Sequence, residues 1–143
     1  MSMFNPEEVM NTTTNEALDT SQPPVPVNDY QAVAENVEIK PSRAGDKLVM
    51  HLRWELMGTG DDAIDGRKIT QYIVLDTTEN GALDMGRGKN TGLGQLRTAL
   101  KQNQPGKPWS PSMIAGNVAI VHVEEDEYEG RPTNRINKVA AAS

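Results

Sequence analysis

The segment KLVMHLRWELMGTGDDAIDGRKITQYIVLD, residues 47–76, carries the clearest secondary-structure pattern in the chain. Apolar and polar side chains alternate through its first half, and the apolar set is Leu48, Met50, Leu52, Trp54 and Leu56. A period of two is typical of a half-buried β-strand, with one face on the core and one in solvent. Residues 67–75 are rich in β-branched and aromatic side chains, which predicts a partner strand. We therefore predict an antiparallel ribbon, joined by a polar loop at residues 57–66 that we expect to be mobile.

The polar face of this ribbon is where we expect a ligand to bind. It carries His51, Arg53, Thr70 and Tyr72, since these alternate with the apolar positions of the two strands. Trp54 shares the parity of Leu48 and Leu52, so we predict that it lies in the core. The loop between the strands holds Asp61, Asp62 and Asp65 and is expected to edge the binding surface without lining it.

The flanking sequence predicts three more strands and one helix. Residues 29–40 alternate in two registers, which a bulge near Glu35–Asn36 would reconcile. An apolar stripe at helical spacing predicts a helix over residues 91–102. Strands are expected over residues 114–124 and 133–139, with a turn between them. Five strands with a helix between the third and fourth is the element order of the OB-fold, a five-stranded Greek-key barrel, although a β-sandwich is also compatible with this pattern.

We accordingly predict a mainly β protein with two parts. Residues 29–143 would form an OB-fold-like five-stranded barrel. Residues 1–28 would form a flexible, largely disordered N-terminal arm, because this segment is polar, contains several prolines and is poor in apolar groups. Within the arm, Asn5-Pro6-Glu7-Glu8 has the features of a helix start. A short helix around Pro6–Met10 is therefore the alternative to a frayed terminus, which the composition of the arm favours.

The charge of the chain is unevenly distributed. The 143 residues have a net charge of −6, yet residues 1–38 hold seven acidic and no basic side chains. The remainder holds 13 of the 20 acidic and all 14 basic residues, a balance of +1. A neutral body with an acidic arm is compatible with an anionic ligand on one face of the body.

No sequence feature predicts a membrane segment, a disulfide framework or an enzyme. The chain has no cysteine, no apolar run near 18 residues and no basic signal-peptide start. The glycine-rich residues 81–94 lack the spacing of a phosphate loop. The two histidines, His51 and His122, fall on different strands without metal-ligand spacing, and the acidic residues 124–129 lack the arrangement of a calcium loop. We expect no catalytic residue, no cofactor and no metal.

Four stretches resemble a known family: AENVEIKPSRAGDKLVMHLRWEL, DGRKITQYIVLD, LGQLRTAL and VHVEEDEYEGRPTNRINKV. Together they are similar to small bacteriophage proteins that are encoded among replication and recombination genes and regarded as OB-fold, single-stranded-DNA-binding proteins. The resemblance spans about residues 28–139, and its most specific piece is EYEGRPTNRINKV. The resemblance implies that the protein binds single-stranded DNA in the host cytoplasm. It also implies that the protein forms a homo-oligomer or contacts replication or recombination proteins. Unlike bacterial single-strand binders with acidic C-terminal tails, this chain ends in VAAAS.

Single-strand binders combine a basic groove for the backbone with aromatic faces for the bases. The residues that we predict to contact DNA are His51, Arg53, Arg67, Lys68, Tyr72, Arg131 and Arg135. Trp109 is either a packed anchor or a second stacking face. The alternative function is a structural or interaction protein, such as a virion or assembly component, which the overall acidity, the few aromatics and the N-terminal arm favour.

Overall fold

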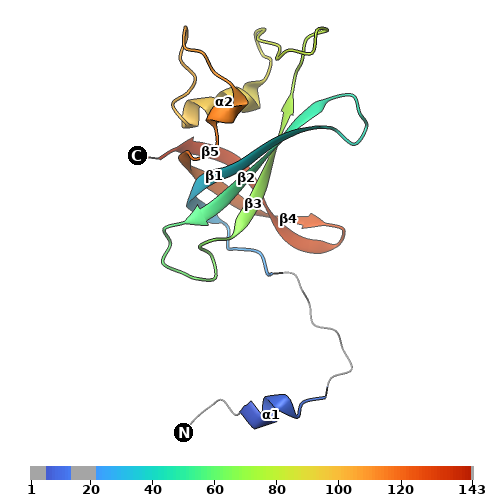
Figure 1. The fold of residues 1–143 in the computed structure, drawn as a ribbon, viewed down its shortest axis with the longest axis vertical. Helices are drawn as coiled ribbons and strands as arrows, with labels where there is room; N and C mark the ends of the chain where they lie inside the picture. The colour runs from blue at the N-terminus through green and yellow to red at the C-terminus, as the bar shows by residue number, and fades with distance from the viewer. Residues whose placement is uncertain (1–5, 14–21, 143) are drawn as a thin grey trace.

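The computed structural model describes residues 6–13 and 22–142 as a mainly β protein (Figure 1). The helices and strands are α1 (Pro6–Met10), β1 (Asn28–Pro41), β2 (Leu48–Met57), β3 (Lys68–Leu75), α2 (Thr91–Ala99), a short 3-10 helix (Pro111–Met113), β4 (Val118–Tyr128) and β5 (Arg131–Ala141). The predictions of five strands and of a helix between the third and fourth are confirmed. A short helix forms at Pro6–Met10, where a frayed terminus was favoured. None of the helices in these residues is long and apolar enough to cross a membrane.

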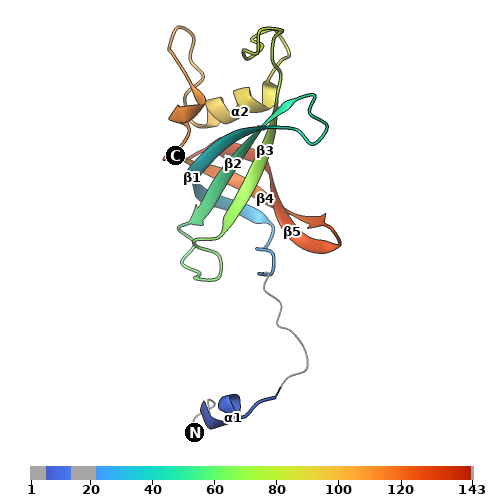
Figure 2. The same ribbon diagram turned by 45° about the vertical axis from the view of Figure 1, so that its right-hand side comes forward.

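The five strands form one antiparallel sheet in the order β3-β2-β1-β4-β5. The sheet curls until its edge strands, β3 and β5, contact each other, with α2 packed against both (Figure 2). No ladder joins β3 to β5 in the described residues, so the sheet is not closed into the barrel that we predicted. A groove lined by side chains of both strands separates them.

The core lies inside the curled sheet and is built from the alternating apolar faces predicted for the ribbon. The fully buried set on β2 is Met50, Leu52, Trp54 and Leu56, which face Ile69, Ile73 and Leu75 of β3. Trp54 donates a hydrogen bond from Nε1 to Oε1 of Gln71 at 3.0 Å, so its one polar atom is satisfied within the core. The prediction that Trp54 is a core residue is confirmed.

Two bulges bend the sheet. The register of β1 against β2 shifts between Ala34 and Asn36, where the bulge was predicted. A second shift lies at His122–Val123, where β5 contributes one extra residue, Asn137. Bulges increase local twist, which allows five strands to curl over one core.

The β4–β5 hairpin is longer than the sequence predicted. We expected strands to end at residue 124 and to resume at 133, but the ladder continues to the pair Tyr128–Arg131. The turn consists of Glu129 and Gly130, both with positive φ, as two-residue hairpins require. The extension projects beyond the core (Figure 1) and is polar on both faces, so it has no apolar alternation by which it could be recognised.

Residues 22–27, which we assigned to the arm, pack against the body in an extended strap. Val25 is only 2% exposed and belongs to the core cluster. Its N–H donates to Oδ1 of Asn134 at 2.9 Å, and its carbonyl accepts from Nδ2 of the same side chain at 3.1 Å. The hydroxyl of Tyr30 donates to the carbonyl of Pro26 at 2.6 Å. The packed body therefore begins before residue 29. Residues 1–5 and 14–21, where flexibility was expected, lie outside the described residues.

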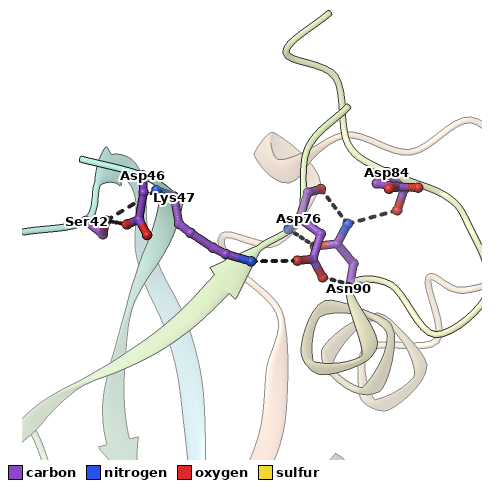
Figure 3. A network of polar contacts seen from close by, with 6 residues as sticks. All are labelled: Ser42, Asp46, Lys47, Asp76, Asp84 and Asn90. Atoms are coloured by element: carbon purple, nitrogen blue, oxygen red, sulfur yellow. Dashed lines mark hydrogen bonds and ion pairs between the residues drawn. The ribbon is translucent and has the colours of Figure 1, made fainter. Parts of the chain in front are cut away.

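A polar network fastens the glycine-containing loop 77–90 between β3 and α2 (Figure 3). Asn90 has a left-handed backbone, with φ 53°, and its side chain bonds the backbone N–H and carbonyl of Asp76 and the carbonyl of Asp84. The carboxylate of Asp76 accepts the N–H of Asn90 at 3.1 Å and pairs with Lys47 at 3.1 Å. These bonds lower the pKa of Asp76 below its ordinary value, and the hydrogen bond from the Asn90 N–H has the largest effect.

Two other loop predictions can be compared with the structure. The loop between β2 and β3, expected to be mobile, is organised by Asp65, whose carboxylate accepts the N–H and hydroxyl of Thr59 and the N–H of Gly60. The hydrogen bond from Thr59 is the main cause of the lowered pKa of Asp65. Trp109 is a packed anchor: its Nε1 donates to Gln102, and the guanidinium of Arg97 lies 4.3 Å from its ring centre.

Candidate nucleic-acid interface

A groove of about 690 Å³ runs along the unpaired seam between β3 and the β4–β5 hairpin. Two walls and one end define it. The β3 wall consists of residues 67–70 and Tyr72, the hairpin wall of residues 126–128 and 132–136, and the strap reaches it through Gln22 and Pro24.

The β3 wall carries two cations and one aromatic ring. Arg67 donates from Nη2 to the carbonyl of Pro23 at 2.7 Å, which aligns the guanidinium along the strap without neutralising its charge. Lys68 forms an ion pair with Glu35 at 2.7 Å. Tyr72 points outward, as predicted from its parity, and is 65% exposed.

The hairpin wall carries a second exposed ring and charges of both signs. Tyr128, at the last ladder pair before the turn, is 62% exposed. Arg135 pairs with Glu124 at 3.0 Å, while Arg131 lies at the hairpin tip beside Tyr128 in an adjoining hollow. Asp126 and Glu127 also line the groove, and neither carboxylate is paired with a cation within the part of the chain that the structure describes.

The outer face of β2 extends the β3 wall. His51 lies directly opposite Tyr72, and their rings meet edge to face with centroids 4.9 Å apart. Arg53 lies opposite Thr70, is exposed, and has no ion pair among residues 6–13 and 22–142. The polar face predicted for the ribbon is therefore a continuous surface that leads into the groove.

The seven predicted contact residues fall into three groups. Four of them line the groove: Arg67, Lys68, Tyr72 and Arg135. Arg131 lies at the hairpin tip next to it, and His51 and Arg53 lie on the adjoining face of β2. None of residues 57–66 lines the groove, in agreement with the expected position of that loop.

Two residues that line the groove, Tyr128 and Asn134, were not predicted from the sequence. Tyr128 was assigned to a turn, but it lies in the extended strand β4. It is two residues after Asp126 and four after Glu124, so the three side chains lie on the same face of the strand. Asn134 looked like an ordinary polar strand residue, because its contact with Val25 spans 109 positions and has no local signal.

The groove is lined by charged, aromatic and hydrogen-bonding side chains. No cluster of three or more histidine, cysteine or acidic side chains that could hold a metal occurs in the described ranges. Its cations, tyrosines and hydrogen-bonding side chains match the groups that contact phosphates and bases.

Comparison with known proteins identifies no family: no protein-family model matches the chain, and no curated protein is similar to it. The groove and the curled five-stranded sheet are therefore the basis for inferring function.

Proposed function

We propose that this protein is a sequence-nonspecific single-stranded-DNA-binding protein that acts in phage DNA replication or recombination. The observation that carries the proposal is the groove, where exposed tyrosines from two walls accompany Arg67, Lys68 and Arg135. The sequence resemblance described above points to the same class of protein.

The arrangement of the strands supports the proposal. The strand order, with the helix between β3 and β4, is that of an OB-fold whose last seam is open. OB-folds bind oligonucleotides on the face of their second and third strands and with the loops between the first and second strands and between the fourth and fifth. The candidate surface includes two of these parts: the outer face of β2 and β3, and the β4–β5 hairpin.

The exposed side chains supply the two kinds of contact that a single strand needs. Tyr72 and Tyr128 offer faces on which bases can stack, worth about 1–3 kcal/mol per base and largely independent of sequence. Arg53 and Arg67 are the cations best placed for phosphates, because neither is engaged by a carboxylate in the described part of the chain. Such contacts place the strand without reading its sequence.

The test is a titration of a labelled oligo-dT of about 15 nucleotides, a length that covers one OB-fold site, followed by fluorescence anisotropy at two salt concentrations. The label belongs on the DNA because Trp54 is buried and Trp109 is packed against Arg97, so neither reports on the groove. Binding should weaken with salt by about 0.7 in log K per log unit of salt for each neutralised phosphate.

The decisive variant is Arg53→Ala/Arg67→Ala, for which we expect roughly tenfold weaker binding at low salt and a salt slope smaller by about 1.4. The matched control is Arg87→Ala/Lys107→Ala, which removes the same charge from two exposed loop positions outside the groove. No binding by the wild-type protein at low salt would exclude the proposed function, and equal losses in both variants would exclude this surface.

One observation favours the second candidate, a structural or interaction protein. Helix α1 exposes Val9 and Met10 beside the acidic Glu7 and Glu8, a combination suited to docking on another subunit. Deleting residues 1–21 would then abolish assembly and leave DNA binding intact. The deletion should stop before residue 22, because the strap that follows contributes Val25 to the core.

A further inference from the structure

We propose that the groove orients a single strand with its phosphates toward β3 and its bases toward the β4–β5 hairpin, where Asp126 and Glu127 favour bases that carry an exocyclic amine over thymine or uracil. This inference rests on the proposed function and adds a base preference to it. It depends on the difference between the two walls of the groove.

In the described residues, the groove-lining charges that have no ion-pair partner differ in sign between the two walls, because Arg135 on the hairpin wall is paired with Glu124. The β3 wall presents Arg67, whose guanidinium is held by the neutral carbonyl of Pro23, and Arg53 extends this wall on β2. The hairpin wall includes Asp126 and Glu127, consecutive residues of β4 whose side chains leave opposite faces of the strand, with Asp126 on the face of Tyr128. In the described residues neither carboxylate pairs with a cation. In the described residues, the carboxylate of Asp126 makes one hydrogen bond, which it accepts from the backbone N–H of Glu127.

A phosphate chain cannot follow both walls equally. Two unit charges of the same sign at about 6 Å repel by about 0.7 kcal/mol even in bulk water, and by more beside protein. The phosphates therefore lie along Arg53 and Arg67, and the bases extend across the groove toward the hairpin. Tyr128 is on that side, so a base that reaches the hairpin has a ring to stack on.

A carboxylate discriminates among the bases that reach it. It only accepts hydrogen bonds, and the N4 amine of cytosine is a donor that Asp and Glu side chains recognise, as is the N6 amine of adenine in the same position. Thymine and uracil present a carbonyl oxygen at that position, which a carboxylate repels. Asp126 and Glu127 therefore act as determinants of base preference.

The experiment compares oligo-dC with oligo-dT of the same length, about 15 nucleotides, by competition at pH 8, where cytosine N3 is unprotonated. We expect the wild-type protein to bind oligo-dC about three- to tenfold more tightly, the worth of one hydrogen bond at a partly exposed site. The ratio should be the same at two salt concentrations, because both oligomers carry the same number of phosphates.

The variant Asp126→Ala/Glu127→Ala should bind oligo-dT at least as tightly as the wild type while the dC-to-dT ratio falls to about one. Glu125→Ala is the matched control for the glutamate part of this double variant. Glu125 and Glu127 are both exposed on β4, but Glu125 does not line the groove. It should keep the wild-type ratio.

The outcomes separate the inference from the proposed function. Equal affinity of the wild type for both oligomers, or an unchanged ratio in the double variant, overturns the base preference while DNA binding stands. Loss of the ratio in Glu125→Ala as well overturns the assignment to the groove. Failure of the wild type to bind either oligomer at low salt overturns the proposed function and the inference together.

Discussion

The strap at residues 22–27 allows a sharp test of where the folded body begins, through the substitution Val25→Ala. The side chain of Val25 is 2% exposed and packs in the core, whereas Val27, two positions later, is 55% exposed. Shortening Val25 removes two methyl groups from the core, a loss of about 1.6 kcal/mol in transfer free energy at ~0.8 kcal/mol each. The cavity left behind raises this to roughly 2–3 kcal/mol.

Val27→Ala is the matched control, since it makes the same chemical change at a solvent-facing position of the same segment. We expect it to change the free energy of unfolding by less than about 0.5 kcal/mol. Urea denaturation at 25 °C, followed by the fluorescence of buried Trp54, measures both variants, and equal m-values would show that only stability has changed. The corresponding decrease in Tm for Val25→Ala is roughly 5–10 °C.

The loss is limited by how firmly the strap is held. If the strap detaches as a unit, the cost of Val25→Ala cannot exceed the free energy of its attachment, which includes the two bonds to Asn134 and the bond from Arg67 to Pro23. A cost for Val25→Ala no greater than that for Val27→Ala would refute the assignment of the strap to the core. The groove would then lose the end wall that Gln22 and Pro24 provide.

Two further predictions concern the network at the start of α2. Asn90→Ala should lower the free energy of unfolding by about 2–4 kcal/mol, because it removes three side-chain hydrogen bonds and places alanine at φ 53°. Asn90→Gly removes the same hydrogen bonds without the backbone strain, so it should destabilise the protein by about 1 kcal/mol less than Asn90→Ala. The lowered pKa of Asp76 means that its contribution is fully present above its unfolded pKa of about 3.9 and is lost as the pH falls through the lower folded value. Denaturation of Asp76→Asn and wild type should therefore differ at pH 7 and converge toward pH 3; a constant difference across this range would contradict the assignment.

The ribbon of β2 and β3 shows why part of the surface could be predicted. Alternation assigned Tyr72 and Arg53 to the solvent face, and antiparallel pairing then placed His51 opposite Tyr72 and Arg53 opposite Thr70. The solvent-facing positions are a consequence of a two-residue period, which a single sequence displays directly, whereas the pairs across the two strands were not predicted. The bulge at Ala34–Asn36 was predictable for the same reason, as a change of parity within one strand.

The groove itself was not predictable, because its walls come from residues far apart in the chain. Lys68 and Arg135 line the same groove only because β3 and β5 are the two edges of a curled sheet, and Val25 meets Asn134 across 109 positions. The hairpin extension that positions Tyr128 shows no alternation of apolar and polar residues. It is held as a strand by its pairing with β5 and not by burial of an apolar face.

Local sequence patterns were thus enough to predict the central part of each strand, the helix between β3 and β4 and the two faces of the ribbon, since local periodicity follows from which side chains must leave water. Only the folded structure shows that the sheet remains open between β3 and β5, that the strap lines one part of the groove, and that Arg67 and the two carboxylates at 126 and 127 line the same groove from different strands. The physical reason is that closure and register between distant strands depend on how bulges and packing curl the whole sheet, which no short stretch of sequence encodes.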